Sequence, residues 1–304
     1  MFLPLVSVIV TTLNHEDFIK IAIESIQSQT YKNLEILVAD DCSSDSTLLI
    51  LEDLKSDSRI KVFSHQNRLG PSENTNFLLD QCTGEYICFM SGDDLIYPEC
   101  IEKKINIALK NSEVCMVFNA NERIDKNNNK IPDTYFEYLN SHTGTLENFL
   151  INGTYIYILG TLFKSTAIGA LRYPEDVASE FHFLHKILEQ GSDRHFVFIQ
   201  EPLAAWRKLD NSMSSLRSAE CYFSSLYSEL YLYQNYPSFR KYILHRILNT
   251  LRIIDETLEF NSIIIKVMRQ ILIQFNRKLL NSLLNLSVFL LYYFHYKLIK
   301  IIFN

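Results

Sequence analysis

The sequence predicts an α/β protein with a mostly parallel central sheet flanked by helices, followed by a helical C-terminal region. Apolar runs rich in β-branched residues alternate along the chain with segments whose apolar residues recur at helical spacing. Several of these runs end in Asp or Asn, so polar side chains should gather at one edge of the sheet. Beyond about residue 215 only helical patterns remain. We therefore divide the chain into an α/β domain, residues 1–214, and a helical region, residues 215–304.

Composition narrows the class of protein. The chain has 304 residues, of which 47% are apolar and 21% charged, and its net charge is −6, so it lacks the basic footprint of a general nucleic-acid-binding protein. Its six cysteines show no CxxC spacing, which argues against a zinc site and a disulfide framework and fits a reducing cytosol. The N-terminus opens into a strand-like run without a signal-peptide pattern, so we expect a cytoplasmic protein.

The opening of the chain reads as a βαβ unit. Residues 5–12 form a nearly continuous apolar run, typical of a strand buried on both faces. Asn14 is placed to begin a helix that continues to about Gln29, and residues 34–39 form the next strand. Further strands are predicted at residues 60–63, 86–90, 114–118 and 154–163, helices around 48–54 and at 71–82, 98–110 and 180–190, and a surface loop at 121–133.

The strand at residues 86–90 is followed by two adjacent carboxylates, Asp93 and Asp94. Open α/β sheets bind ligands beyond the carboxyl ends of their strands, and hard divalent cations bound to phosphates take oxygen ligands. The alternative is that both residues only form a turn and cap the next helix. Asp40 and Asp41 follow another strand; because successive residues of an extended chain point in opposite directions, one can face a ligand while the other fixes the turn.

Three ordered stretches carry a family resemblance: residues 6–14 (VSVIVTTLN), 40–47 (DDCSSDST) and 84–94 (GEYICFMSGDD). They resemble the signatures of family 2 glycosyltransferases. The resemblance implies a GT-A fold with a Rossmann-like central sheet. It further implies inverting transfer of a sugar from a nucleotide diphosphate donor, among which a UDP-sugar is the first expectation. It also implies that Thr11, Leu13 and Asn14 surround the base, that Asp40 hydrogen-bonds the base, and that Asp93 holds a divalent cation, Mg²⁺ or Mn²⁺.

The chain departs from the family pattern at two positions. Ser91 stands where the family often has Asp, so the metal would be held by one protein carboxylate with phosphate oxygens and water. Thr75 stands where Arg is frequent; Arg68 is the nearest replacement for binding the donor, and a solvated loop arginine is the alternative.

The resemblance also indicates a catalytic base. The family has an Asp about eleven residues before a helix-ending Gly, and counting back from Gly191 places Glu180 there. The alternatives are a favourable acidic residue in the first turn of a helix, or the Glu-Asp pair at 175–176 as the base. Arg207, in a Trp-Arg pair that replaces the usual Tyr-Arg, is a candidate for binding the diphosphate or for a structural ion pair. No Gln-x-x-Arg-Trp motif is present, which favours addition of a single sugar.

Residues 261–304 contain no Asp or Glu but six Lys and Arg: Lys266, Arg269, Arg277, Lys278, Lys297 and Lys300. A basic, apolar segment is typical of a helix on an anionic membrane surface. A spanning helix at about 279–296, or a hairpin packed on its own domain or in a homo-oligomer, are the alternatives.

We therefore expect a metal-dependent, inverting glycosyltransferase of hexosyl or N-acetylhexosaminyl type on the cytoplasmic face of a membrane. It would move one sugar to a hydroxyl of a glycan or lipid-linked acceptor in surface polysaccharide synthesis. The alternative is a non-catalytic nucleotide-sugar or glycan-binding protein of the same fold.

Overall fold

The computed structural model describes residues 3–132, 143–153, 157–173, 180–191, 194–209 and 218–257. The chain divides into two compact units. The first comprises residues 1–149 and 154–216, and the second residues 150–153 and 217–304. The six C-terminal cations and the pair at 175–176 lie outside the described residues. That residues 1–214 form an independent domain stays a prediction.

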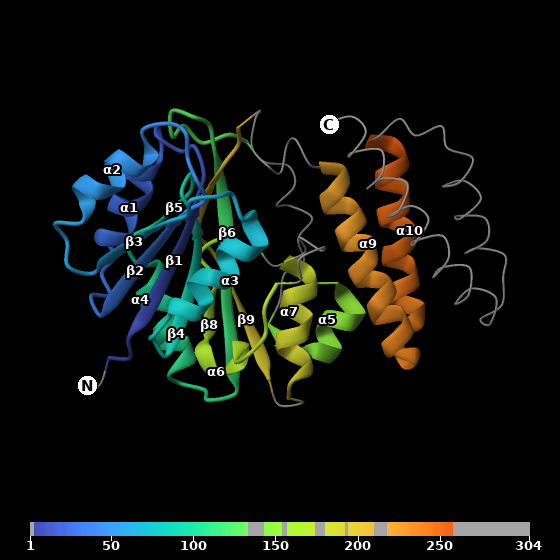
Figure 1. The fold of residues 1–304 in the computed structure, drawn as a ribbon. Helices are drawn as coiled ribbons and strands as arrows, with labels where there is room; N and C mark the ends of the chain where they lie inside the picture. Colours follow the sequence, from blue (N-terminus) through green and yellow to red (C-terminus); the bar gives the residue numbers. More distant parts are fainter. Residues whose placement is uncertain are drawn as a thin grey trace. The chain divides into compact units, whose positions relative to one another are not determined.

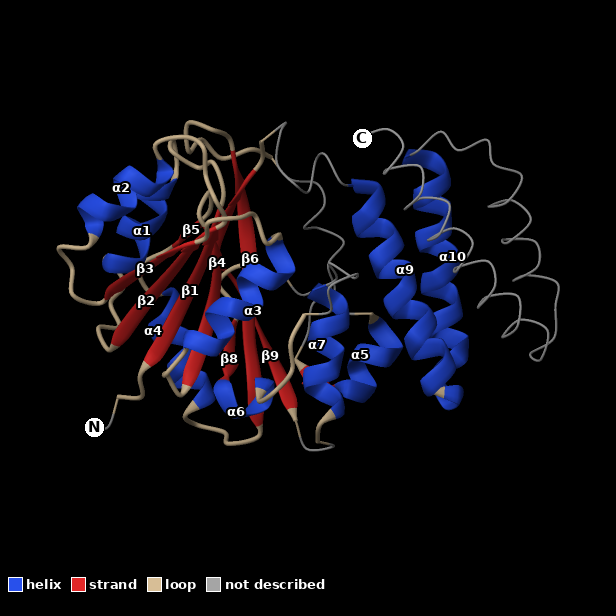
Figure 2. Cartoon of the chain, viewed as in Figure 1, coloured by secondary structure: helices blue, strands red, loops and turns tan. Residues whose placement is uncertain are grey.

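A mixed central sheet forms the first unit, with strand order β3-β2-β1-β4-β8-β6-β9-β5 and β7 paired with β9 (Figures 1 and 2). The neighbours of β1 on both sides run parallel to it, whereas β8 is antiparallel to β4 and to β6. The strands are β1 Val6–Thr12, β2 Leu34–Asp40, β3 Ile60–Ser64, β4 Tyr86–Ser91, β5 Leu95–Ile96, β6 Val114–Ile124, β7 Gly144–Thr145, β8 Leu162–Lys164 and β9 His195–Arg207.

Helices pack against both faces of this sheet. Helix α3 packs on β1 and β2 in front of the sheet in Figure 1, and α4, behind it, packs on β6 and β8. Apolar positions at helical spacing explain this packing, because α1 buries Ile19, Ala22, Ile23 and Ile26 on one face. The helices are α1 Ile19–Gln27, α2 Thr47–Leu54, α3 Pro71–Gln81, α4 Cys100–Ala108, α5 Leu146–Asn152, α6 Ser165–Ile168 and α7 Glu180–Glu189.

The chain order places a switch point at β1. From β1 the chain moves outward to β2 and β3, then returns to β4 on the other side of β1. The register pairs Thr12 with Asp40 and Thr11 with Ser91. Ligands of open α/β sheets bind at such a point, because the loops after the two neighbouring strands diverge. The predicted carboxyl edge of the sheet is therefore the place to look for a site.

Three sequence predictions need correction. Helix α1 begins at Ile19 rather than at Asn14, which has a left-handed backbone with φ of 54°. The strand predicted at 154–163 is described only as β8 Leu162–Lys164, after Gly160 turns the chain with φ of 71°. Strand β6 continues to Ile124, so the start of the predicted loop at 121–133 is a strand that pairs with β9.

Helices α9 Ser218–Asn235 and α10 Arg240–Thr257, with the short 3₁₀ turn η2 Pro237–Phe239 between them, are described in the second unit. A partly buried ion pair joins the two helices, since Arg246 Nε donates to Glu229 Oε1 at 2.8 Å. Burial raises the pKa of Glu229, and the Arg246 charge acts against that shift. Among the helices that the structure describes, none combines the length and apolar character needed to cross a membrane.

Candidate active site

The loops that follow β1 and β2 are tied to each other by side-chain hydrogen bonds. Asn14 accepts from the backbone N–H of Ser44 at 2.8 Å, and Ser43 Oγ accepts from the N–H of Asn14 at 2.8 Å. One residue on, Thr47 Oγ1 accepts from the N–H of His15 at 2.8 Å, and Glu16 accepts from the N–H of Ser46 at 2.8 Å. This is why Asn14 adopts a left-handed conformation instead of starting a helix, since Asn tolerates φ > 0.

Asp40 and Asp41 are both buried, and their side chains hold different loops. Asp40 accepts from the backbone N–H of Ser43 at 2.9 Å and from the Ser43 hydroxyl. Asp41 accepts from the N–H groups of Leu69 and Gly70 at 2.6 and 2.9 Å, and so fixes the entry to α3. The two carboxylates therefore have different partners, as expected for consecutive residues at a strand end. The contact of Asp40 with a base stays a proposal.

Asp93 lies beyond the end of β4 with only 12% of its side chain exposed. The hydroxyl of Ser91 donates to Oδ1 of Asp93, and His15 Nε2 lies 3.9 Å from Oδ2. Gly92 permits this arrangement, because a Cβ there would lie 2.6 Å from Thr12 Oγ1 and 3.0 Å from His15 Nδ1. One carboxylate, one hydroxyl and one imidazole thus lie together at the carboxyl edge.

Arg207 donates hydrogen bonds to the turn that contains Asp93 and Asp94. It is buried, its Nε donates to the Asp93 carbonyl at 2.7 Å, and its other two nitrogens donate to the Asp125 carbonyl and to Asn128 Oδ1, each at 2.7 Å. Its backbone N–H donates to Asp94 Oδ1 at 2.8 Å. Because all three guanidinium nitrogens have protein acceptors, this geometry favours the structural alternative for Arg207 over diphosphate binding.

Asp94 is the deeper carboxylate of the pair. Burial raises its pKa well above the usual range, the neighbouring Asp93 charge raises it further, and Glu180 adds to the same effect. Hydrogen bonding and the charge of Arg207 act in the opposite direction. Glu180 is therefore close enough for its charge to act on Asp94, although it comes from a distant part of the sequence.

Glu180 begins α7, as the count back from Gly191 predicts. The aromatic ring of Phe183 in the same helix stacks on Tyr173 with centroids 4.4 Å apart and lies 6.1 Å from Phe89 of β4, which fixes the helix to the sheet. The residue Glu180 as a whole is exposed, but desolvation of its carboxyl group by the surrounding protein raises the pKa to about 7. A hydrogen bond with the backbone of Ile158 lowers the pKa by a smaller amount. A carboxyl group that titrates near neutrality suits general-base catalysis.

The remaining candidate residues lie around the same edge. Thr11 and Leu13 are half-buried at the end of β1 and just after it. Arg68 has 56% of its side chain exposed and lies 4.0 Å from Asp41, so it is free to move toward a ligand. Within the described residues, no group of three or more His, Cys, Asp and Glu side chains converges as a metal site. Any cation here would need ligands from a bound substrate or water.

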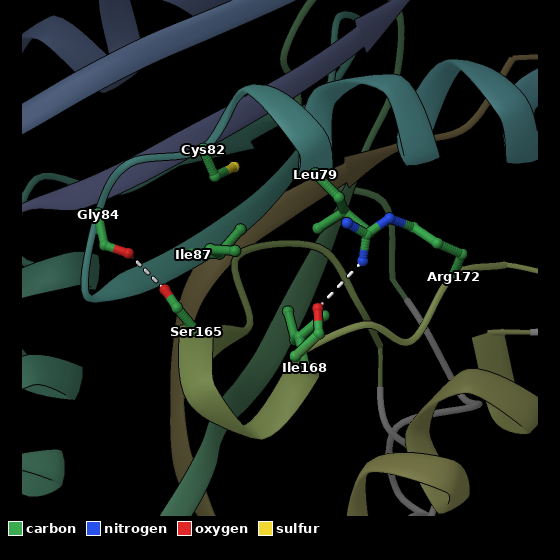
Figure 3. A pocket seen from close by; sticks show the side chains of 8 residues that line it. Leu79, Cys82, Gly84, Ile87, Ser165, Ile168 and Arg172 are labelled. Carbon is green, nitrogen blue, oxygen red and sulfur yellow. Dashed lines mark hydrogen bonds between the residues drawn. The ribbon is translucent and has the colours of Figure 1, made fainter.

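A pocket of about 160 Å³ lies elsewhere on the first unit (Figure 3). It is at the amino end of β4, because Gly84 precedes that strand and Ser165 follows the antiparallel β8. Ser165 donates to the Gly84 carbonyl, and Arg172 is bound to Asp80 and to the Gly169 carbonyl. Its polar groups are thus used by the protein itself, and we assign no ligand to it.

A comparison with models of protein families identifies the family to which these Asp pairs belong. A model of "Glycosyl transferase family 2" matches residues 7–165, a range that contains both Asp pairs. The chain belongs to glycosyl transferase family 2. Consistent with this, an uncharacterised glycosyltransferase of Rickettsia typhi is 32% identical over 75% of this chain and 73% of its own length.

Two relatives with named activities match this family 2 glycosyltransferase over shorter stretches. The GalNAc(5)-diNAcBac-PP-undecaprenol beta-1,3-glucosyltransferase of Campylobacter jejuni is 48% identical over 30% of each chain. The UDP-Glc:alpha-D-GlcNAc-diphosphoundecaprenol beta-1,3-glucosyltransferase of Escherichia coli is 37% identical over 40% of this chain and 48% of its own. The match thus spans less than half the length of either protein.

Solved structures support the same GT-A architecture. TarS of Staphylococcus aureus in complex with UDP-GlcNAc superposes with a TM-score of 0.60 at 20% identity, over 86% of this chain and 76% of that one. The mannosyltransferase PcManGT of Pyrobaculum calidifontis, in complex with GDP-Man and Mn²⁺, gives a TM-score of 0.63 at 16% identity, over 96% and 86%. At these identities the likeness shows the fold alone.

The sequence reasoning missed one residue of this edge, His15. The signal that could have found it is its position directly after Asn14, in the loop that leaves the central strand. The supporting role of Asn128 was missed as well, because nothing in a polar loop indicates that a distant arginine binds it.

Proposed function

We propose that the protein transfers one hexosyl or N-acetylhexosaminyl group, with inversion, from a nucleotide diphosphate sugar to a hydroxyl of a lipid-linked glycan. The observation that carries this proposal is that Glu180 lies near enough to Asp94 for its charge to raise the pKa of that carboxyl group. A base with a pKa of about 7 would then act near the turn that carries Asp93, the carboxylate proposed for the leaving group. The named relatives act on undecaprenol-linked sugars, which supports the acceptor class.

Each residue in the proposal has one task. Glu180 takes the proton from the acceptor hydroxyl as that oxygen attacks the anomeric carbon, and the bond to the nucleotide diphosphate breaks on the opposite face. Thr11, Leu13, Asn14 and Asp40 would surround the base at the end of β1. Arg68 would approach the diphosphate from the β3–α3 loop. Asp94 and Arg207 hold the turn that presents Asp93, so we give them a positioning role.

The residues present fit a divalent cation at Asp93. Carboxylate oxygens are the ligands that Mg²⁺ and Mn²⁺ take, and both ions accept substrate phosphates and water for the remaining positions. Ser91 already orients one oxygen of Asp93, which leaves Oδ2 for a ligand. When bound, the cation would stabilise negative charge on the departing diphosphate. The neighbour with Mn²⁺ and GDP-Man supports this assignment by fold.

The proposal extends to the place where the enzyme works. A lipid-linked acceptor requires access to a membrane surface, and residues 261–304 carry cations without any acid. We propose peripheral attachment at the cytoplasmic face, with UDP as the first nucleotide to test and surface polysaccharide as the product. The relatives that act on undecaprenol diphosphate sugars support this, as does the UDP-GlcNAc complex of TarS.

A donor screen tests the function without knowledge of the acceptor. UDP- and GDP-sugars are incubated with the full chain and Mg²⁺ or Mn²⁺, and release of nucleoside diphosphate is measured. We expect slow hydrolysis of one UDP-hexose or UDP-N-acetylhexosamine. Asp93→Asn should abolish it with an unchanged melting temperature, because the amide loses the charge that holds the cation. Full activity of Asp93→Asn at saturating metal would disprove the role of Asp93, and hydrolysis of no donor by the wild type would favour the non-catalytic alternative.

A further inference from the structure

Ser91 stands where family members often have Asp, so position 91 offers no carboxylate to a cation at Asp93, and the adjacent Asp94 accepts the backbone N–H of Arg207. The structure places an imidazole beside Asp93 instead. His15 Nε2 is 3.9 Å from Asp93 Oδ2, and the two side chains are only 20% and 12% exposed. The histidine comes from the loop after β1, so it reaches Asp93 across the gap between two neighbouring strands.

His15 is held in this position by four contacts. Its N–H donates to Thr47 Oγ1 at 2.8 Å, and its carbonyl accepts from the N–H groups of Phe18 and Ile19 at 2.9 and 2.8 Å. Its ring nitrogen Nδ1 lies 3.2 Å from Thr12 Oγ1. Because the backbone and one ring nitrogen are fixed by the protein, Nε2 is the atom left to face Asp93.

We propose that His15 Nε2 is a second protein ligand of the divalent cation, alongside Asp93 Oδ2. This inference rests on the proposed function, because it assumes that a nucleotide diphosphate and its cation bind at Asp93. It assigns to a nitrogen atom the coordination position that an acidic side chain at position 91 would otherwise supply.

The distances are compatible with this assignment. A first-row divalent ion lies about 2.1 Å from a histidine nitrogen or a carboxylate oxygen, so two ligands of one ion can be up to about 4.2 Å apart. The observed 3.9 Å falls inside that limit, and a right-angled pair needs a closure of roughly 1 Å, which a small side-chain rotation supplies.

The surroundings match those of a metal-binding histidine. Such a residue donates its other ring N–H to a protein acceptor, which fixes the tautomer and the orientation of the ring. Thr12 Oγ1 is in place to accept from Nδ1, and this tautomer leaves the lone pair on Nε2. Ser91 then has a role of its own, since its hydroxyl orients the Asp93 carboxylate without competing for the ion.

The assignment has a consequence for the choice of metal. Imidazole suits transition metals, whereas Mg²⁺ prefers sites made of oxygen atoms. A site of one carboxylate, one imidazole and two phosphate oxygens should bind Mn²⁺ and Co²⁺ in preference to Mg²⁺. Replacing the imidazole by a carboxylate at position 91 should reverse that preference.

The test is pulsed electron paramagnetic resonance of the full chain with Mn²⁺ and UDP, with GDP in parallel. We expect the nitrogen modulation of a directly bound imidazole, which changes to the ¹⁵N pattern in uniformly ¹⁵N-labelled protein. His15→Asn should lose this signal and weaken Mn²⁺ binding by about tenfold or more, since even loss of an outer-sphere partner costs about 10–100-fold. His195→Asn is the matched control; this residue starts β9 at the opposite edge of the sheet and should leave both readouts unchanged.

A double variant keeps the test decisive if His15→Asn folds poorly. Combining it with Ser91→Asp supplies a second carboxylate, and Mg²⁺ should then bind more tightly relative to Mn²⁺ than in the wild type. If the wild-type complex shows no nitrogen modulation, the inference about His15 is overturned. The metal role of Asp93 still stands in that case, provided that Asp93→Asn abolishes Mn²⁺ binding. If Asp93→Asn binds Mn²⁺ and UDP as the wild type does, the metal site of the proposed function fails with it.

Discussion

Replacing Glu180 by Gln should remove most of the turnover and its rise with pH. Desolvation raises the pKa of Glu180 to about 7, so about a tenth of the side chains are ionised at pH 6 and about nine tenths at pH 8. The rate of a reaction that needs the ionised base should therefore rise roughly tenfold over this interval. The amide cannot accept the proton, and loss of a general base costs about 10² to 10⁴-fold.

The assay is donor transfer or hydrolysis at saturating metal from pH 5.5 to 9, with stability measured in parallel. Because the folded pKa exceeds the ordinary value of 4.5, the folded chain binds this proton more tightly than the unfolded chain, and stability falls as pH rises from about 4.5 through 7. Glu180→Gln removes this effect, so its melting temperature relative to the wild type should rise with pH, by an amount that solvent exposure keeps small.

Glu189→Gln, at the far end of the same helix, is the matched control and should keep the wild-type pH profile. The prediction is refuted if Glu180→Gln retains the inflection near pH 7, which would assign it to Asp94 or another group. It is also refuted if Glu175→Gln or Asp176→Asn, rather than Glu180→Gln, removes turnover.

Three other outcomes follow from the contacts described above. Arg207→Lys should lower the free energy of unfolding by about 2–4 kcal/mol, because one ammonium group cannot replace three buried donor nitrogens. Denaturant titration measures this loss, and Arg68→Lys, at an exposed side chain, is the control whose stability should not change. Gly92→Ala should cost about 1–3 kcal/mol and weaken Mn²⁺ binding, because the new methyl group displaces Thr12 and His15; unaltered metal affinity would contradict this. The full chain should bind anionic vesicles more tightly at low salt than at high salt, by about 1 kcal/mol for each cation near the surface, and co-sedimentation that does not change with salt would argue for another role of this segment. The cations to be replaced by Gln in that experiment are Lys266, Arg269, Arg277, Lys278, Lys297 and Lys300.

The central strands were predictable from sequence because they are buried on both faces. Every residue of β2 is buried, and most residues of β1 and β4 are, so each of these strands is a short, predominantly apolar run that the sequence marks clearly. Strand β6 was underpredicted for the opposite reason. Its second half contains both buried and half-exposed residues and includes polar Asn121 and Glu122, which a composition argument assigns to a loop.

Side-chain roles were predictable only where a motif marked them. The start of α7 at Glu180 followed from the spacing to Gly191. The start of α1 at Ile19, in contrast, could not be derived from the presence of Asn14. A helix cap and a loop-to-loop hydrogen bond require the same side chain, and only the position of Ser43 and Ser44 in space decides between them. The guanidinium of Arg207 is a similar case, since its acceptors come from two separate loops.

The hydrogen bonds between the loops after β1 and β2 have a consequence for protein engineering. Residues 14–16 and 43–47 exchange backbone and side-chain contacts in both directions, so neither loop has an independent conformation. Substitutions in contact with one another are not additive in their effects. Chimaeras that exchange nucleotide specificity with a relative should therefore carry both loops together, because grafting one alone would leave its partners in the other without their acceptors.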